Sequence, residues 1–379
     1  MLSVRRSNTM SSYNGPDHFY PQYSQSAPSI ADRSYYSVEP KQKQRFGSCV
    51  WISVVLFILF ILILIICLIV FFTWKPTYAK QVTNGQNGPQ LLVYRQPKLG
   101  NHRDLLVADA LGDMMRDGST SICLLDTLHF SEKPTVVFLE GHLPNSRHFD
   151  IDQVLRDGAN SSQRLVAPLQ FQAYVRSLGL TKNCHIVAYD HGEVELAITS
   201  ATFVWWIFKV YGFERISVLN GGLEAWRRLV ERNARSNSFT LASGLPGPVA
   251  NGNLIASWNS YWLAELDDVL NALGKRDTLF LDSRPPSEFR SGRIVGAVNM
   301  PTLELLTDQG ALKTLPELKQ LMAKRRIFGD RPMIVYGSDS IDASALYFVV
   351  VQAGYNVKLY EGGWSEFGAR GPLQFKAQG

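Results

Sequence analysis

The stretches His185-Ile-Val-Ala-Tyr-Asp190 and Met333-Ile-Val-Tyr-Gly337 decide the fold of this 379-residue chain. Each is a short, nearly continuous apolar run that leads directly into a loop. Such a run is typical of a strand that is buried on both faces of a parallel sheet. The same strand-and-loop unit occurs twice, which indicates that the chain contains an internal duplication.

Matching segments flank both units in the same order. Asp126 and Asp282 each follow an apolar run, and a glycine-led segment begins after each aspartate, at Gly141 and at Gly292. Short apolar strands alternating with helical stretches predict α/β domains, each a parallel sheet with helices on both faces. The duplication therefore predicts two such domains.

The domain boundaries follow from changes in composition. We place the first domain at 91–234 and the second at 259–379, because each length is ordinary for one domain. Between them, 235–258 is rich in Asn, Ser, Gly and Pro and lacks apolar periodicity, so it is predicted to be a linker.

A long apolar segment precedes the domains. The 23 residues from Val50 to Phe72 contain no charge, and a helix of this length spans roughly 35 Å, enough to cross a bilayer core of about 30 Å. We predict a transmembrane helix at 46–74, preceded by a disordered tail at 1–45 and followed by a stalk at 75–90. A buried soluble helix is the alternative, but it would need a polar stripe.

Charge around this segment predicts its orientation. Four basic residues lie close to its amino side, against two on its carboxyl side: Arg33, Lys41, Lys43 and Arg45, then Lys75 and Lys80. The positive-inside rule therefore places the amino terminus in the cytoplasm and the two domains in the lumen or outside the cell. Asn160 begins an Asn-Ser-Ser sequon and is the candidate glycosylation site.

Several classes of function lack support in the sequence. The net charge of +5 is modest and is not gathered into a basic face, so nucleic acid is not an expected partner. His142 and His148 have no companion metal ligands, so no metal and no cofactor are predicted. Of the four cysteines, Cys123 and Cys184 open apolar runs and are interpreted as buried, inert thiols.

A group of motifs in both halves resembles the tandem-domain rhodaneses, the thiosulfate and 3-mercaptopyruvate sulfurtransferases. The motifs are Glu140-Gly-His-Leu-Pro144, Phe149-Asp-Ile-Asp152, Val204-Trp-Trp-Ile-Phe208, Val218-Leu-Asn-Gly-Gly222, Leu281-Asp-Ser-Arg284, Glu288-Phe289, Gly296-Ala-Val-Asn-Met-Pro301 and Leu359-Tyr-Glu-Gly-Gly-Trp364. The resemblance covers roughly Leu91 to Gly371. It implies that the loop after the second-domain strand begins with a cysteine, whose thiolate accepts a sulfane sulfur from an anionic donor.

In this sequence the second-domain loop reads Gly337, Ser338, Asp339, Ser340, Ile341, Asp342. Gly337 stands where the resemblance implies the cysteine, and the second domain contains no other cysteine. The resemblance implies a glycine at the fourth position and a small hydroxyl or an arginine at the sixth. The two aspartates would also repel an anionic donor. Asp190, at the same place in the first domain, matches the inert aspartate common in the family.

Other chemistry for this loop is weaker. Ser338 has no histidine in the second domain to activate it, and a rhodanese-like phosphatase would need the same cysteine. The resemblance makes Arg284 a remnant of the substrate site, although an ion pair with Asp282 is a simpler role. Cation binding by Asp339 and Asp342 remains a third hypothesis.

The sequence therefore predicts a membrane-anchored, catalytically inactive tandem rhodanese-like protein. It would act as a binding or scaffolding pseudoenzyme for an unknown protein or small molecule. The alternative is an active thiosulfate or 3-mercaptopyruvate sulfurtransferase.

Overall fold

The structure is a computed structural model that describes residues 56–62, 104–157, 163–192, 197–235 and 239–379. The chain divides into two compact units, Met1–Gly88 and Pro89–Gly379. Of the first unit, only 56–62 is described, as a short helix with exposed apolar side chains. Most of the predicted membrane helix at 46–74 lies outside the described residues, as do the tail and the stalk. No helix within the described ranges is long and apolar enough to cross a membrane.

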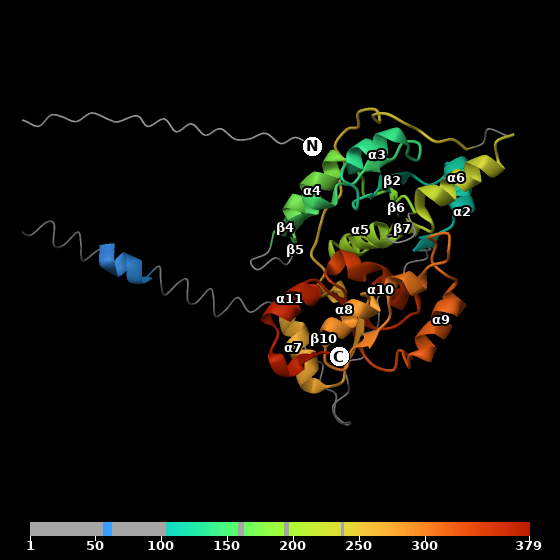
Figure 1. Cartoon of the computed structure of the whole chain (residues 1–379). Coiled ribbons are helices and arrows are strands. Elements are labelled where there is room, and N and C mark those ends of the chain that lie inside the picture. The colour runs from blue at the N-terminus through green and yellow to red at the C-terminus, as the bar shows by residue number, and fades with distance from the viewer. Residues whose placement is uncertain (1–55, 63–103, 158–162, 193–196, 236–238) are drawn as a thin grey trace, which may run out of the picture. The chain divides into compact units, whose positions relative to one another are not determined.

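The first domain follows a strand-helix alternation (Figure 1). Its elements are β1 (Leu105–Leu106), α2 (Ala108–Asp117), β2 (Ile122–Asp126), α3 (Pro134–Glu140), β3 (Arg147–His148), η1 (Ile151–Val154), β4 (Leu155–Asp157), β5 (Gln163–Leu165), α4 (Pro168–Ser177), β6 (His185–Tyr189), α5 (Thr199–Val210), β7 (Ile216–Leu219) and α6 (Gly222–Arg232).

The second domain repeats this alternation. Its elements are η2 (Ser260–Trp262), β8 (Leu263–Ala264), α7 (Leu266–Lys275), β9 (Leu279–Asp282), α8 (Pro286–Ser291), β10 (Arg293–Ile294), β11 (Val298–Asn299), η3 (Thr302–Leu305), α9 (Leu315–Lys324), β12 (Met333–Tyr336), α10 (Ser340–Gln352), β13 (Val357–Tyr360), α11 (Gly363–Arg370), η4 (Leu373–Phe375) and β14 (Lys376–Ala377). The described residues of the predicted linker, 235 and 239–258, contain no helix or strand beyond a single bridge between Ala242 and His142.

Both domains contain a five-stranded parallel sheet with the same strand order. The first sheet has the strand order β1-β7-β6-β2-β3. The second sheet, read from the equivalent edge, has the order β8-β13-β12-β9-β11. β6 and β12 are therefore equivalent central strands, and so are β2 and β9. The predicted duplication and the parallel sheets are confirmed. The short antiparallel pairs β4-β5 and β10-β14 were not predicted.

Helices cover both faces of each sheet. In β6, Ile186 and Ala188 point into one core, and Val187 and Tyr189 point into another. Alternation of this kind follows from the two-residue period of a strand. The core behind Val187 also receives side chains of α2 and α6.

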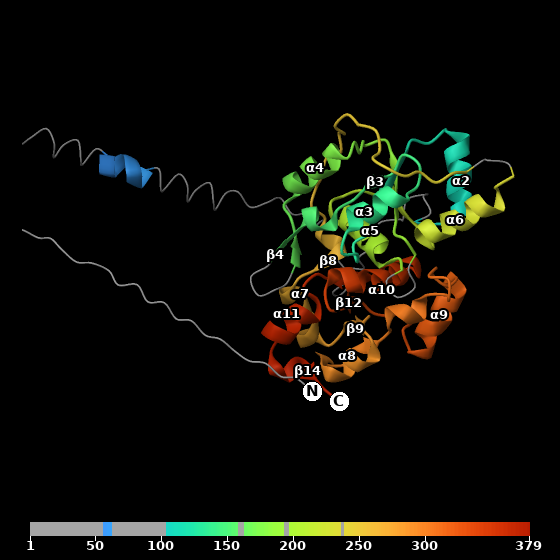
Figure 2. The same cartoon turned by 45° about the horizontal axis from the view of Figure 1, so that its top comes forward.

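One hydrophobic core continues through both domains. Helices α5 and α10 lie side by side between the two sheets in both views (Figures 1 and 2). Every residue of α5 is buried, and Trp205 of α5 stacks edge-on against Phe348 of α10 at 4.9 Å between ring centroids. Thr202 and Ser344 also share a hydrogen bond of 2.9 Å between their hydroxyls. The two domains therefore pack as one body around this helix pair.

Each domain also donates a backbone hydrogen bond to a side chain of the other domain. The N–H of Leu165, in β5, donates to Glu361 Oε1 at 2.6 Å in the second domain. In return, the N–H of Leu312 donates to Asn220 Oδ1 at 2.7 Å in the first domain. Asn220 and Glu361 both directly precede the paired glycines, so the two contacts are equivalent under the duplication. Arg164 strengthens one of them by an ion pair with Glu366 at 2.7 Å.

The interpretation of Cys123 and Cys184 as free thiols was wrong. The two residues form a disulfide, with 5.7 Å between their Cα atoms. Cys123 lies in β2 and Cys184 directly precedes β6, and these strands are paired in parallel. The pairing of strands that are far apart in sequence brings the two sulfurs together, and the spacing of the cysteines does not reveal it.

Candidate functional site

Two equivalent loops begin where the central strands end. Asp190 directly follows β6, and Gly337 directly follows β12. The second-domain loop is short: Gly337, Ser338 and Asp339 connect β12 to α10, and Asp339 is the N-cap of that helix. Because both strands are central in parallel sheets, these loops lie at the carboxyl edge of each sheet, where α/β proteins bind ligands.

Gly337 lies in a space that is closed to any side chain. A Cβ atom built at this position would lie 2.6 Å from Ser283 Oγ and 2.9 Å from Asp342 Oδ2. It would also lie 2.9 Å from the backbone nitrogen of Ala343. Contacts under 3.0 Å require the neighbours to move, so a cysteine at 337 would displace both Ser283 and Asp342.

The carboxylate of Asp342 turns back into the loop. Asp342 Oδ2 accepts a hydrogen bond from the backbone N–H of Ser338 at 3.0 Å. Burial raises the pKa of Asp342, the hydrogen bond from Ser338 lowers it, and the nearby charge of Asp339 raises it again, with a net increase. A carboxylate of the chain itself therefore occupies the place where the loop N–H groups could receive an anion.

Asp339 uses a second N–H group of the loop. Its Oδ1 atom accepts from the N–H of Asp342 at 3.0 Å, as an N-cap side chain does at the start of a helix. The turn before α11 holds the loop from the other side, since the N–H of Trp364 donates to Gly337 O at 2.8 Å. Gly363 permits this close approach: its φ is +55°, and a Cβ there would lie 2.5 Å from Ser338 O.

The remaining loop residues carry no activated group. Ser338 Oγ donates to Glu288 Oε2 at 3.3 Å, on the exposed side of the loop. Ser340 and Ile341 are buried, at 1% and 3% relative exposure, within the first turn of α10. Three carboxyl groups lie in or beside the loop, those of Glu288, Asp339 and Asp342. Among the described residues, no group of three or more His, Cys, Asp and Glu side chains is placed to hold a metal ion.

Arg284 is buried and paired within the fold. Its Nε and Nη2 atoms donate to the two carboxylate oxygens of Asp282, at 3.0 and 2.6 Å, and Nη2 also donates to Gly292 O at 2.7 Å. Only 2% of the residue is exposed. Burial would lower the pKa of Arg284, but hydrogen bonding to Asp282 raises it overall. The structure thus shows the ion pair between Arg284 and Asp282.

The first-domain loop also contains a buried carboxyl group. Asp190 is 4% exposed, and its Oδ1 atom accepts from the N–H of Gly192 at 3.1 Å. Its Oδ2 atom meets no hydrogen-bond donor among the described residues. Burial raises the pKa of Asp190 to about 7. Both equivalent loops therefore contain a carboxyl group of the chain itself, Asp190 in one and Asp342 in the other.

The structure brings together a histidine group that was not predicted. His191 Nε2 lies 2.8 Å from Asp126 Oδ2, and His148 Nδ1 lies 3.7 Å from Asp126 Oδ1. Although burial opposes ionisation, the proximity of His148 and the hydrogen bond with His191 lower the pKa of Asp126. Asp126 is the counterpart of Asp282, so two histidines occupy the role that Arg284 has in the second domain. The position of His191 directly after Asp190 was a signal that could have revealed this group.

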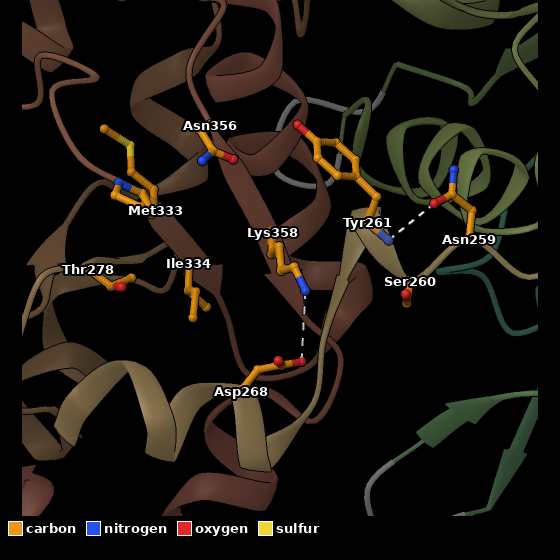
Figure 3. Close-up of a pocket in the computed structure, with 10 residues that line it drawn as sticks. Asn259, Ser260, Tyr261, Asp268, Thr278, Met333, Ile334, Asn356 and Lys358 are labelled. Carbon is orange, nitrogen blue, oxygen red and sulfur yellow. Dashed lines mark hydrogen bonds and ion pairs between the residues drawn. The ribbon is translucent and has the colours of Figure 1, made fainter. Parts of the chain in front are cut away.

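A separate cavity of about 410 Å³ lies at the other edge of the second sheet (Figure 3). Its lining includes Thr278 before β9, Met333 at the start of β12, and Asn356 and Lys358 around the start of β13. The cavity is therefore at the amino ends of the strands, and the loop of Gly337 is at their carboxyl ends. The candidate glycosylation site Asn160 lies outside the described residues.

Comparison with known proteins relates both domains to one family. A model of the rhodanese-like domain matches residues 107–229 and 265–370. The 3-mercaptopyruvate sulfurtransferase of Escherichia coli (strain K12) is 32% identical over 248 residues, 62% of this chain and 83% of that protein. The thiosulfate sulfurtransferase of Gallus gallus is 28% identical over 249 residues, 63% of this chain and 82% of that protein.

Solved structures of related proteins match the same two-domain fold. SseA from Escherichia coli matches 70% of this chain and 100% of its own length, with a TM-score of 0.59 and 28% sequence identity. The Tum1 protein from Saccharomyces cerevisiae shares the fold, with a TM-score of 0.63 over 73% of this chain and 98% of its own, at 18% identity. Because the matched segments cover both halves of the duplication, this chain belongs to the rhodanese-like family and contains two copies of its domain.

Proposed function

We propose that this protein is a rhodanese-like pseudoenzyme that has lost sulfur transfer and retains the fold as a binding module. One observation carries the proposal: the loop after β12 begins with Gly337, and the carboxylate of Asp342 occupies the loop. Glycine offers no nucleophile, and no cysteine occurs anywhere in the second domain.

The chemistry of sulfur transfer explains why this loop is unsuited to it. The reaction requires a thiolate, whose negative charge is stabilised by converging N–H groups. In this chain, the N–H groups of Ser338 and Asp342 already donate to Asp342 and Asp339. A third carboxylate, that of Glu288, lies beside Ser338. An anionic sulfur donor would meet like charges at close range, which disfavours its binding.

We further propose that the two domains are anchored to a membrane by the segment 46–74 and face the lumen or the outside of the cell. The apolar segment and the basic residues before it support this topology. The disulfide between Cys123 and Cys184 adds independent support, because disulfides persist in oxidising compartments. In this setting the module would present a binding surface to an extracytoplasmic protein or small molecule.

A sulfur-transfer assay tests the loss of activity. The full-length chain is incubated with thiosulfate or 3-mercaptopyruvate as donor and cyanide or a thiol as acceptor, beside the 3-mercaptopyruvate sulfurtransferase of Escherichia coli. We expect turnover by the control enzyme and none by this chain. Turnover by the wild-type chain that is lost when the protein is heat-inactivated would instead support the alternative, an active sulfurtransferase.

A gain-of-function pair distinguishes the two causes in this loop. Gly337→Cys supplies a thiol but leaves the carboxylate of Asp342 beside it, so we expect it to remain inactive. Gly337→Cys combined with Asp342→Ser also removes the carboxylate and frees the N–H of Ser338. Detectable turnover in the double variant alone would identify Asp342 as the second obstacle.

A further inference from the structure

We propose that the cavity at the amino ends of β9, β12 and β13 binds a small zwitterion with an apolar body, as represented by a free α-amino acid. The cavity measures about 410 Å³ and lies away from the loop of Gly337. Cavities of roughly 300 to 1,000 Å³ are the usual size for small-molecule sites. The proposal does not depend on whether the protein transfers sulfur.

The cavity exists because one edge of β13 is left open. β8 pairs only with the second half of β13, where Leu263 lies opposite Leu359 and Ala264 lies opposite Tyr360. Lys358 is therefore paired on one side only, with Ile334 of β12. Since η2 and α7 flank this open edge, their side chains form the remaining wall (Figure 3).

The floor of the cavity is apolar. Ile334 and Pro332 line it, and Ile334 is 5% exposed and packed in the core beside α7. The neighbouring Met333 borders the cavity, but its side chain belongs to the core on the opposite face of the sheet. Such a floor favours a ligand that carries an aliphatic group, because burying the group removes apolar surface from water.

The wall carries one charge of each sign. Lys358 and Asp268 both line the cavity and form a loose ion pair, with 4.0 Å between Nζ and Oδ2 (Figure 3). Both side chains are partly exposed, at 37% and 47%. A ligand with a single charge would be attracted by one group and repelled by the other. A zwitterion would insert into this ion pair, with its carboxylate on Lys358 and its ammonium on Asp268.

Asp268 is held in position for this role. Its Oδ2 atom accepts from the N–H of Glu265 at 3.0 Å, within the capping box of α7. This bond orients the carboxylate at the start of α7. Ser260, Thr278 and Asn356 supply neutral polar groups around the same cavity.

Equilibrium dialysis of the full-length chain with radiolabelled L-leucine tests the proposal. We expect saturable binding that unlabelled L-leucine displaces. N-acetyl-L-leucine lacks the ammonium and L-leucine methyl ester lacks the carboxylate, so neither should displace the label effectively. Absence of saturable binding up to roughly 10 mM, or equal displacement by the blocked analogues, would overturn the proposal.

Two variants assign the binding to this cavity. Lys358→Met and Asp268→Asn should each weaken binding about tenfold or more. Asn retains an acceptor for the Glu265 N–H, so the helix cap is preserved, and thermal melting checks the fold of both variants. Lys275→Met and Asp267→Asn, which lie on α7 outside the cavity lining, are the matched controls and should bind like wild type. Unchanged binding in both Lys358→Met and Asp268→Asn would contradict the assignment.

Discussion

The carboxylate of Asp342 accepts the N–H of Ser338 at 3.0 Å, so the loop after β12 is occupied by a side chain of its own helix. The same carboxylate lies 2.9 Å from the place where a Cβ at Gly337 would be. The two residues are thus matched: the absence of a side chain at 337 makes room for the carboxylate of 342.

The reactivity of an introduced thiol tests this match. In Gly337→Cys the neighbouring carboxylates of Asp342 and Asp339 should raise the thiol pKa, because like charges disfavour the thiolate. Adding Asp342→Ser should lower that pKa by about one unit or more, which corresponds to ~1.4 kcal/mol. The pH dependence of alkylation by iodoacetamide measures it, in a background with Cys49→Ser and Cys67→Ser. Equal thiol pKa values in the single and double variants would contradict the role of Asp342.

The buried Asp190 predicts a pH-dependent stability. Its pKa is about 7 in the folded protein, compared with roughly 3.9 for an aspartate in an unfolded chain. At a pH between these two pKa values, Asp190 is protonated in the folded form and ionised in the unfolded form. The contribution of Asp190 is therefore most favourable below about pH 4, declines as the pH rises to about 7, and is constant above it.

Asp190→Asn removes this dependence. We expect the variant to gain stability relative to wild type as the pH rises from 4 to 8, by up to about 4 kcal/mol. Thermal melting at both pH values measures the change, and Asp308→Asn, at an exposed position, controls for the loss of a charge. A stability difference between Asp190→Asn and wild type that is the same at both pH values would show that Asp190 titrates normally.

The disulfide predicts a large effect of reduction. Cys123 and Cys184 are 61 residues apart, and closing a loop of this length stabilises the folded state by about 4 kcal/mol in the chain-entropy description. Cys123→Ser with Cys184→Ser, or treatment of the wild-type chain with reductant, should lower the urea midpoint accordingly. Cys49→Ser with Cys67→Ser is the control. Thiol labelling of unreduced, denatured protein that finds Cys123 and Cys184 free would contradict the disulfide.

The contact between Arg164 and Glu366 predicts coupling between the domains. Glu366 is 1% exposed, and Arg164 from the first domain donates to it at 2.7 Å. Arg164→Met should destabilise the protein by about 2 kcal/mol, because a hydrogen bond to a buried charge is lost. Arg370 pairs with the same carboxylate but is 44% exposed, so Arg370→Met should cost less than about 1 kcal/mol. Equal urea midpoints for the two variants would indicate that the contact does not join the domains energetically.

The sequence predicted the parts of the fold that repeat. The two central strands, the two loops after them and the order of motifs were all visible in the duplication, because buried parallel strands leave continuous apolar runs. Of the glycines that are paired in both halves, Gly221, Gly222 and Gly363 have positive φ values, which glycine adopts readily. Gly362 does not, and its lack of a side chain instead leaves room for Glu366.

Features that depend on tertiary contacts were not predicted. The strands β4, β5, β10 and β14 contain only two or three residues each, which is too short for a recognisable period. The Asp126 histidines and the disulfide arise because β2 lies between β3 and β6. The composition of the Gly337 loop revealed its acidity, but the inward turn of Asp342 depends on the first turn of α10.

Transfer of labelled sulfur to the protein itself tests the central claim most directly. The full-length chain is incubated with thiosulfate labelled in its sulfane sulfur, without an acceptor. The protein is then separated from the free donor, and its radioactivity is counted. The Escherichia coli 3-mercaptopyruvate sulfurtransferase, incubated with its own labelled donor, is the positive control. We predict that the Escherichia coli protein retains label that a thiol reductant releases, and that this chain retains none above a heat-denatured control. Stoichiometric, thiol-releasable label on this chain would contradict the loss of sulfur transfer.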